Sequence, residues 1–398
     1  MRIVLIADTY PPMKTSGAVQ IRDLVAELSK QEHELTVVLP DASLKVNWEL
    51  YDESKNTKVL RLKALQTKDI NYFSRAIGEH LLSFFMYSNL KKSPLVDISW
   101  DALIWYSPTI FLGSLVNKIK KKTGCPAYLI VRDIFPEWAV DMGLLQRGFI
   151  YKYFKRVERY QYEQADTIGV QTPSNCEYFK KEHAELQANI EVLNNWLSDP
   201  QSDQCSIQLS ESALAGRRIL VYTGNIGVAQ GMDILIDLAN SMKENQSVGF
   251  VFVGRGTAVE QIKEKAAGFC LDNILFFDEI NPNEIPSLLQ QCHAGLIALD
   301  PRHKNDNIPG KFLAYMQSGL PVLGNINPGN DLEDLVEKHK VGKVVSTNSL
   351  TDLNNAANEL LEEIDVDTGF KARCLQLSKS QFSAKSAAEQ IIDALKNS

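Results

Sequence analysis

Lys311 stands in the pattern Pro309-Gly310-Lys311, where a proline, a glycine and a cation open a predicted helix. Proline is favoured at the first helical position, and the free N–H groups of a helix N-terminus attract anions. The pattern therefore predicts an anion-binding site at Pro309, Gly310 and Lys311. An ordinary helix start followed by a solvated lysine is the alternative interpretation.

A second candidate loop follows the predicted strand 219–222 and is rich in glycine. Glycine repeated at a strand-to-helix turn marks a place where the backbone comes close to a ligand or to another segment. The spacing is neither GxGxxG nor the Walker pattern, so neither a classical dinucleotide site nor a P-loop NTPase is predicted. We expect Gly224, Asn225, Gly227 and Gln230 to contribute to a phosphate site.

Further candidates in the second half of the chain share one property, a place in a loop after a predicted strand. They are Gly254, Arg255, Glu279, Ile280, Arg302 and Asp306. The carboxyl ends of parallel strands meet at one edge of a sheet, and ligands of such sheets bind there. One such loop is weak evidence, but three of them indicate a nucleotide-phosphate site.

The first half offers fewer candidates. Ser16 and Gly17 precede a predicted amphipathic helix, where small residues allow a diphosphate or an acceptor to approach, although a structural turn is the simpler interpretation. Asp133 follows the predicted strand 127–131. Its carboxylate either orients a sugar or acceptor hydroxyl or caps local backbone N–H groups.

The elements that must position these residues are short apolar runs that alternate with helical patterns. The predicted strands are 3–7, 35–39, 58–62, 102–106, 127–131, 167–170, 219–222, 249–253, 274–277, 294–298, 321–324 and 342–345. Runs that are apolar throughout are typical of parallel strands covered on both faces by helices. The sequence predicts an α/β protein made of two Rossmann-like, doubly wound domains that face a cleft.

The domain boundaries follow from composition. Residues 198–217 are rich in Ser, Gln, Asp and Pro and are predicted as a linker. It separates an acceptor domain at 1–197 from a donor domain at 218–380. A C-terminal helix at 381–398 is expected to pack back on the first domain.

Bulk properties exclude other classes of protein. The formal net charge is −7, which disfavours nucleic-acid binding. The six cysteines show no metal-ligand spacing, so no metal site is predicted. The chain shows neither a signal peptide nor an apolar stretch long enough to cross a bilayer, and we expect a cytoplasmic protein.

The helix predicted at 70–92 is rich in large apolar residues and ends in Lys91-Lys92. One interpretation is an interfacial helix at the inner face of a membrane, near a lipid-linked acceptor. The other is a helix buried against the first sheet. An exposed apolar patch would distinguish them.

Four segments carry a resemblance to family-four glycosyltransferases, which have the GT-B fold. Tyr222–Gly231 resembles the "GNIG-AQG" motif of that family, and 131–137 is similar to its "RDLWPES" segment. Residues 309–322 resemble "PSKLLEYMAAGKPV", and 1–20 resembles the opening of the family. The resemblance is strongest to the branch that builds bacterial surface polysaccharides, which includes N-acetyl-fucosamine transferases.

The resemblance implies a retaining, metal-independent transferase without a cofactor. The implied donor is a UDP-sugar, with an N-acetylated hexosamine or deoxyhexosamine, and GDP is an alternative carrier. The implied acceptor is a saccharide on a polyprenyl diphosphate. Lys311, Asp133 and Asp306 are the expected catalytic residues.

The chain departs from the family pattern at several positions. Of two glutamates common near the last motif, the first is the shorter Asp306 and the second is Ala314. Residues near Asn225 and Gln230 replace a basic pair that grips the diphosphate, and Arg132 replaces a histidine. Phosphate binding then depends on Lys311, Arg302 and backbone N–H groups. A nucleotide-sugar epimerase, a sugar-binding protein and a catalytically degenerate partner subunit remain alternatives.

Overall fold

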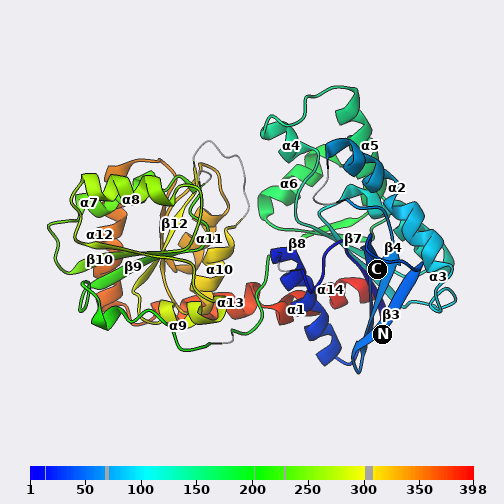
Figure 1. Ribbon diagram of the computed structural model, residues 1–398, viewed down its shortest axis with the longest axis horizontal. Coiled ribbons are helices and arrows are strands. Elements are labelled where there is room, and N and C mark those ends of the chain that lie inside the picture. The colour runs from blue at the N-terminus through cyan, green and yellow to red at the C-terminus, as the bar shows by residue number, and fades with distance from the viewer. Residues whose placement is uncertain (14, 68–70, 201, 228–229, 301–307) are drawn as a thin grey trace. The chain divides into compact units, whose positions relative to one another are not determined.

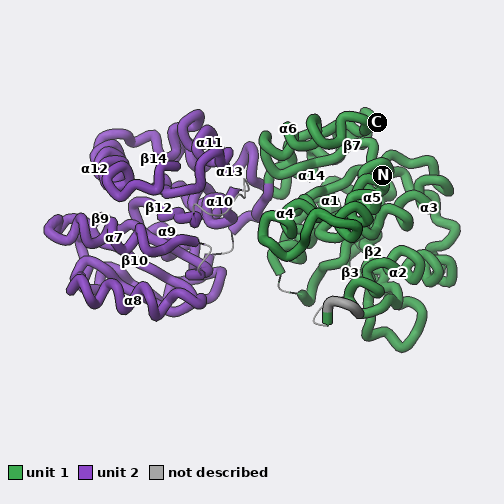
Figure 2. Tube along the Cα trace, turned by 90° about the horizontal axis from the view of Figure 1, so that it is seen from above, with its two compact units in different colours: residues 1–194, 384–398 green, residues 195–383 purple. Residues whose placement is uncertain are grey.

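The computed structural model describes residues 1–13, 15–67, 71–200, 202–227, 230–300 and 308–398. The chain forms two compact units. Unit 1 comprises residues 1–194 and 384–398, and unit 2 comprises residues 195–383 (Figure 2). Unit 1 is therefore assembled from two separate stretches of the chain.

Unit 1 is built around one eight-stranded sheet covered by helices (Figure 1). Its strands are β1 (Arg2–Ile6), β2 (Glu34–Asp41), β3 (Trp48–Ser54), β4 (Thr57–Lys63), β5 (Ala102–Ser107), β6 (Ala127–Val131), β7 (Thr167–Val170) and β8 (Asn189–Val192). Its helices are α1 (Ser16–Lys30), α2 (Tyr72–Leu90), α3 (Gly113–Thr123), α4 (Glu137–Asp141), α5 (Phe149–Tyr162), α6 (Pro173–Glu182) and α14 (Ala384–Lys396).

The strand order of unit 1 is β3-β4-β2-β1-β5-β6-β7-β8, and all pairs except β3–β4 are parallel. β5 and β6 are buried along their whole length, as strands covered on both faces must be. The chain moves outward in one direction from β1 and in the other from β5. The carboxyl ends of β1 and β5 therefore flank a topological switch point, where doubly wound sheets bind ligands.

Unit 2 contains a six-stranded sheet in the order β11-β10-β9-β12-β13-β14, with every pair parallel. Its strands are β9 (Arg218–Thr223), β10 (Val248–Val253), β11 (Ile274–Phe277), β12 (Ala294–Ala298), β13 (Val322–Asn325) and β14 (Gly342–Val345). Its helices are α7 (Asp233–Ser241), α8 (Val259–Gly268), α9 (Ile285–Leu289), α10 (Gly310–Gln317), α11 (Leu332–His339), α12 (Leu350–Val366) and α13 (Phe370–Gln381).

Alternation along the strands divides the core of unit 2 between the two faces of its sheet. Leu220 and Tyr222 belong to one apolar cluster, and Ile219 and Val221 belong to the other. α12 contributes to the first cluster and α10 to the second. The switch point of this sheet lies between β9 and β12, whose carboxyl ends carry the glycine-rich loop and residues 299–300.

All twelve predicted strands are present, and the predicted α/β architecture is confirmed. The expectation of six strands in the first half was wrong, because β3 and β8 were missed. Both lie at edges of the sheet, and each is at least partly exposed along its length. They lack the uniformly apolar run that identified the central strands.

Residues 198–217 pack into unit 2, where Cys205, Ile207, Leu209 and Leu214 join its apolar cluster. α13 lies in unit 2, whereas α14 contacts α1 and β6 in unit 1. No helix among the described residues is long and apolar enough to span a membrane.

Candidate functional site

The backbone at the end of β9 is in close contact with the backbone at the end of β10. Gly254 has a φ of +155°, and a Cβ atom built on it would lie 1.9 Å from the carbonyl oxygen of Gly224. The Gly224 N–H donates to the Val253 carbonyl at 2.9 Å. Only glycine at 254 allows this approach, so this glycine first of all maintains the structure of the loop.

Lys311 occupies the first turn of α10, at the carboxyl edge of the sheet. Its Nζ donates to the Tyr222 hydroxyl at 3.0 Å and lies 4.4 Å from the centre of that ring. The Tyr222 hydroxyl in turn donates to the Asn225 carbonyl at 2.7 Å. Burial lowers the pKa of Lys311 to about 8. Among the described residues, no carboxylate forms an ion pair with it.

Tyr315 fixes α10 against the two strands that flank the switch point. Its hydroxyl lies 3.2 Å from the carbonyl oxygens of Val221 and Leu296, and it accepts the Thr223 N–H at 3.3 Å. Gly295 leaves room for the ring, since a Cβ there would lie 2.4 Å from it. The first turn of α10 is thereby held next to the glycine-rich loop.

Asn225 and Gln230 contact each other, which their separation in the loop had not shown. The Asn225 side-chain amide donates to the Gln230 side-chain oxygen at 3.1 Å, and the Gly227 N–H donates to the same oxygen at 2.9 Å. Gln230 therefore closes the loop on itself. The Gly227 N–H, which we expected to serve a phosphate, already has a partner inside the protein.

The remaining donor-site candidates of unit 2 have diverse surroundings. Arg255 forms an ion pair with Glu279 at 2.8 Å, and both side chains are exposed. Ile280 packs against the apolar cluster on the α10 face. Pro309 caps α10, and Gly310 has open space where a Cβ would lie. Arg302 and Asp306 lie outside the described residues.

A cavity of about 280 Å³ lies at the switch point of unit 1. Its lining includes Asp8, Gly17, Arg75, Glu79, Tyr106 and Thr109. The sequence had indicated only Gly17 as a site residue among these. Tyr106 was missed, although it ends the predicted strand 102–106, and a place at the carboxyl end of a strand is the signal that could have found it.

Gly17 lies directly under the Tyr106 hydroxyl, so close that a Cβ at 17 would approach Oη to 2.8 Å. Tyr106 is buried, and this burial raises its pKa to about 12. Ser16, at the start of α1, is exposed, and the helix is capped by Thr15, which accepts the Ala18 N–H. Gly17 thus belongs to the wall of the cavity.

Arg132 and Asp133 directly follow β6, whose neighbour β5 carries Tyr106. Arg132 is buried and donates to the Leu193 carbonyl at 2.9 Å, and its burial lowers its pKa to about 10. Desolvation by the surrounding protein raises the pKa of the Asp133 carboxyl, although the residue is exposed. The positive charge of Arg132 partly opposes this shift. Glu137, the first residue of α4, accepts the Tyr151 hydroxyl at 2.6 Å.

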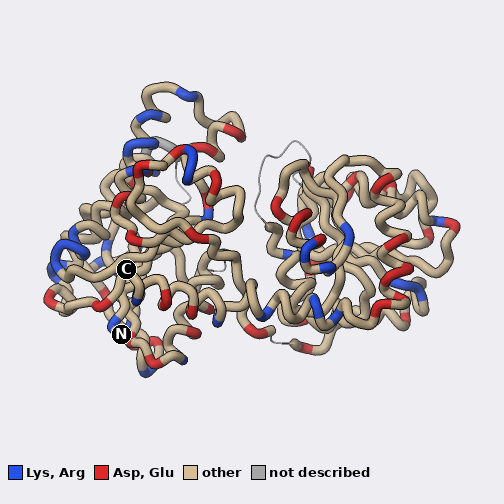
Figure 3. Tube along the Cα trace, turned by 180° about the vertical axis from the view of Figure 1, so that it is seen from behind, with Lys and Arg blue, Asp and Glu red and all other residues tan. Residues whose placement is uncertain are grey.

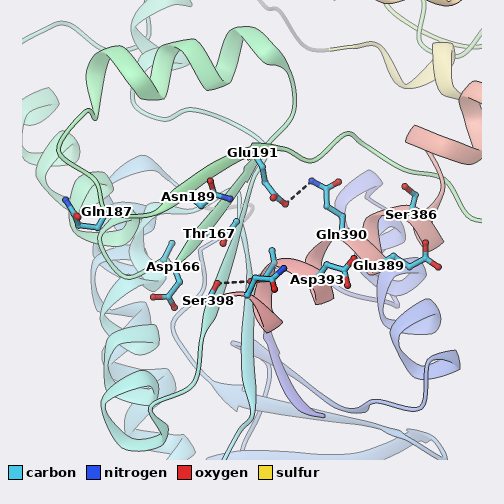
Figure 4. Close-up of a pocket in the computed structure, with 13 residues that line it drawn as sticks. Asp166, Thr167, Gln187, Asn189, Glu191, Ser386, Glu389, Gln390, Asp393 and Ser398 are labelled. Carbon is cyan, nitrogen blue, oxygen red and sulfur yellow. Dashed lines mark hydrogen bonds between the residues drawn. The ribbon is translucent and has the colours of Figure 1, made fainter.

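A larger cavity, of about 800 Å³, lies at the opposite edge of the same sheet (Figure 4). It lies beside the first residues of β7 and β8 and the return helix α14, and Glu191 accepts the Gln390 side-chain amide at 2.8 Å. Its lining is rich in carboxylates and contains none of the predicted site residues. In the described part of the chain, no cluster of three His, Cys, Asp or Glu residues suits a metal ion.

Comparison with known proteins shows that most of the second unit is similar to a known family. Residues 217–363 match the model of the family described as "Glycosyl transferases group 1". The match covers less than half of the chain. It contains β9 to β14, the glycine-rich loop and α10, so Lys311 and Tyr222 both lie within the matched residues.

Two relatives extend the similarity beyond residues 217–363. WbjE of Pseudomonas aeruginosa, assigned as a glycosyltransferase, is 24% identical over 263 residues, which is 64% of this chain and 64% of WbjE, less than two thirds of its length. WcaI of Escherichia coli strain K12, assigned to colanic acid biosynthesis as a glycosyl transferase, is 24% identical over 317 residues, 74% of this chain and 76% of WcaI.

Solved structures show that the whole chain has the GT-B fold. WaaG, a glycosyltransferase involved in lipopolysaccharide biosynthesis, has a TM-score of 0.62 at 15% identity and covers 100% of both chains. HepE of Anabaena, solved in complex with UDP and glucose, has a TM-score of 0.65 at 14% identity, again over 100% of both chains. At these identities the likeness establishes the fold alone.

Proposed function

We propose that this protein is a retaining glycosyltransferase that moves a sugar from a UDP-sugar to a carrier-linked saccharide in surface polysaccharide biosynthesis. The match of residues 217–363 to group 1 glycosyl transferases supports the reaction class. The assignments of WcaI and WaaG support the biosynthetic context, and the UDP bound to HepE supports the nucleotide. Unit 2 is the proposed donor unit and unit 1 the proposed acceptor unit.

The observation that carries this proposal is the placement of Lys311. A lysine whose pKa is lowered to about 8 by burial lies at the N-terminus of a helix, at the switch point of a parallel sheet. A nearby diphosphate would supply the anion that such a cation and the free N–H groups of the helix both attract. Gly310 adds a stretch of backbone that a ligand can approach closely.

In the proposed reaction the bond between the anomeric carbon and the diphosphate oxygen breaks as the acceptor oxygen bonds to the same carbon. Charge develops on the departing UDP. Lys311 and the first N–H groups of α10 stabilise that charge, which is the electrostatic contribution expected of a preorganised site. The acceptor hydroxyl proton passes to the leaving phosphate oxygen, so no protein base and no metal ion are required.

The cavity of unit 1 is the proposed acceptor site, with Asp133 orienting the reacting hydroxyl. Asp133 follows β6 and Tyr106 lies near the end of the neighbouring strand β5, so both stand at the carboxyl edge of the sheet. Arg75 and Glu79 form an ion pair at 2.9 Å in the cavity wall and offer both a donor and an acceptor to sugar hydroxyls. We further propose an N-acetylated hexosamine or deoxyhexosamine as the sugar, a polyprenyl diphosphate as the carrier, and a location at the cytoplasmic face of a membrane.

The experiment that tests the donor assignment is a binding panel. UDP, GDP, ADP, CMP and UDP-N-acetylhexosamines are titrated into the protein while its melting temperature is followed, because a ligand that binds only the folded state raises it. The expected result is stabilisation by UDP and UDP-N-acetylhexosamines that is lost in Lys311→Met. Stabilisation by GDP alone would overturn the choice of nucleotide, and no stabilisation by any nucleotide would overturn the transferase proposal.

A further inference from the structure

Unit 1 exposes large apolar side chains on α4, on α5 and on the turn that joins them. They are Trp138, Met142, Leu144, Phe149, Ile150 and Tyr153, and we call them the α4–α5 surface. Phe149 is 92% exposed, Leu144 70% and Ile150 64%. Single exposed apolar residues are ordinary on a protein surface. Six of them within sixteen residues of sequence indicate an interaction site.

The sequence of α5 divides the helix into three stripes. Glu158, Gln161 and Tyr162 face inward and are fully or almost fully buried. Phe149, Ile150 and Tyr153 are exposed and, at helical spacing, share one side of the helix. The exposed residues Lys152 and Arg156, four positions apart, follow the adjacent stripe. An apolar stripe bordered by a basic stripe is the pattern of a helix that lies in a membrane interface.

Local charge favours a negatively charged partner. Residues 138–156 contain four Lys and Arg residues and one acid, Asp141, in a chain whose formal net charge is −7. Two of the four, Arg147 and Lys155, form ion pairs with Glu137. In the described part of the chain, no ion pair involves Lys152 or Arg156. Figure 3 shows basic positions along the part of unit 1 that holds α4 and α5. A symmetric contact between two copies of this surface would bring like charges together.

The surface is firmly attached to the unit. Glu137, the first residue of α4, accepts the Tyr151 hydroxyl at 2.6 Å and forms ion pairs with Arg147 at 3.3 Å and Lys155 at 3.4 Å. The Tyr153 hydroxyl lies 2.5 Å from Nδ1 of His80 on α2. The exposed Ile77 and Phe84 lie on α2 to either side of His80 and extend the apolar area.

α2 itself, in which we had weighed an interfacial helix, buries Leu82, Met86 and Leu90 in the core of unit 1. α2 therefore contributes only Ile77 and Phe84 to the exposed apolar area. We propose that the α4–α5 surface docks unit 1 on an anionic lipid bilayer, with the apolar side chains entering the headgroup region and Lys152 and Arg156 contacting lipid phosphates. This inference deepens the proposed function, because a lipid-linked acceptor would be met at that bilayer.

The test uses the full-length protein without nucleotide or acceptor, so its outcome is independent of sugar transfer. The protein is sedimented with vesicles of phosphatidylcholine alone and with vesicles that contain phosphatidylglycerol. We expect binding to the anionic vesicles that weakens as salt is raised. Phe149→Ser/Ile150→Ser should reduce the bound fraction at least fivefold, and Lys152→Glu/Arg156→Glu should abolish the preference for anionic vesicles.

Two control variants match these changes. Val46→Ser/Val366→Ser replaces two apolar residues that are 59% and 80% exposed, and Lys45→Glu/Lys55→Glu reverses two exposed charges elsewhere. Both should bind vesicles like the wild type. An unchanged melting temperature and UDP response in the α4–α5 variants establish that fold and donor site are intact.

The inference would be overturned if the wild-type protein did not bind anionic vesicles. It would also be overturned if the α4–α5 variants bound them as well as the controls do. Oligomerisation in sedimentation velocity that the Phe149→Ser/Ile150→Ser variant abolishes, without vesicle binding, would overturn it in favour of a contact between copies. Vesicle binding without any nucleotide response would instead overturn the proposed function and leave this inference standing.

Discussion

The Lys311 ammonium and the Tyr222 hydroxyl lie 3.0 Å apart, with the cation 4.4 Å from the ring centre. A tyrosine stabilises a lysine without neutralising it, because its hydroxyl and its ring face carry only partial negative charge. The cation therefore keeps its capacity to bind a full negative charge. This separates Lys311 from lysines such as Lys265, whose partner is the carboxylate of Asp237 at 2.8 Å.

Replacing Lys311 by methionine should weaken UDP binding by about 10- to 100-fold, the amount expected for one charge-assisted hydrogen bond of about 1.5–3 kcal/mol. Isothermal titration calorimetry gives the dissociation constant directly. Lys371→Met, an exposed lysine of α13, is the matched control and should bind UDP normally. Equal affinity in the two variants would remove Lys311 from the donor site.

The affinity for UDP should fall as the pH rises through about 8, because burial lowers the pKa of Lys311 to about 8 and only the protonated form attracts phosphate. The phosphate charge is constant in this range, since its second pKa is about 6. Titrations at pH 8 in buffers of different ionisation enthalpy should show proton uptake on binding, and Lys311→Met should abolish it. The unliganded protein should gain stability between about pH 8 and 10.5, since only the unfolded chain keeps this proton there.

Substitution by alanine should lower the stability of the protein at Gly254 but not at Gly310. Gly254→Ala forces a Cβ to within 1.9 Å of a backbone oxygen and should cost about 2 kcal/mol or more. Gly310→Ala meets open space in the first turn of α10, so stability should stay within about 1 kcal/mol of the wild type. UDP affinity should nevertheless fall about tenfold if the ligand approaches this backbone closely.

Urea unfolding and calorimetry together check both glycine variants. Gly268→Ala, at the end of α8 with no atom near the added Cβ, is the control for both and should keep stability within about 1 kcal/mol of the wild type and leave UDP binding unchanged. A Gly310→Ala protein that is stable and binds UDP normally would show that position 310 does not contact the donor.

Gly17 and Tyr106 should be energetically coupled. Gly17→Ala brings a Cβ to 2.8 Å from the Tyr106 hydroxyl and should cost about 1–2 kcal/mol by overpacking. In Gly17→Ala/Tyr106→Phe the clashing oxygen is gone, so the double variant should be more stable than the sum of the single changes by about 1 kcal/mol. Additive free energies of unfolding would contradict the contact.

Asp133→Asn should reduce kcat/KM about 100-fold if the carboxylate orients the acceptor hydroxyl. UDP affinity should not change, because Asp133 belongs to unit 1. The raised pKa of Asp133 predicts that activity declines on the acid side at a pH above that of an ordinary aspartate. The exposed Asp141, in Asp141→Asn, is the control. A loss of stability with normal kcat/KM would assign Asp133 the capping role instead.

The fold was readable in the sequence because burial on both faces makes a central strand apolar at every position. β5 and β6 met that condition, whereas β3 and β8 did not, since edge strands have one exposed side. Strand order, by contrast, depends on which apolar surfaces pack together, and no local pattern records it.

The position of a candidate residue could be predicted where its type has a backbone reason to stand in a loop or at a helix start, while its role in binding stays a prediction. Gly254 and Lys311 are examples, the first for its φ and the second for its place in a helix N-terminus. Contacts between side chains could not be predicted. Asn225 bonds to Gln230, and Gly17 contacts Tyr106, but these pairs meet only in the folded chain.

The chain leaves unit 1 after residue 194, completes unit 2, and returns with α14 to pack on α1 and β6. During translation, unit 2 is an uninterrupted stretch and is synthesised whole before α14 leaves the ribosome. Until α14 has been synthesised, the surface of α1 and β6 on which it packs stays uncovered. Unit 1 can therefore complete its fold only after unit 2 has been synthesised, when Ile391, Ile392 and Leu395 of α14 become buried.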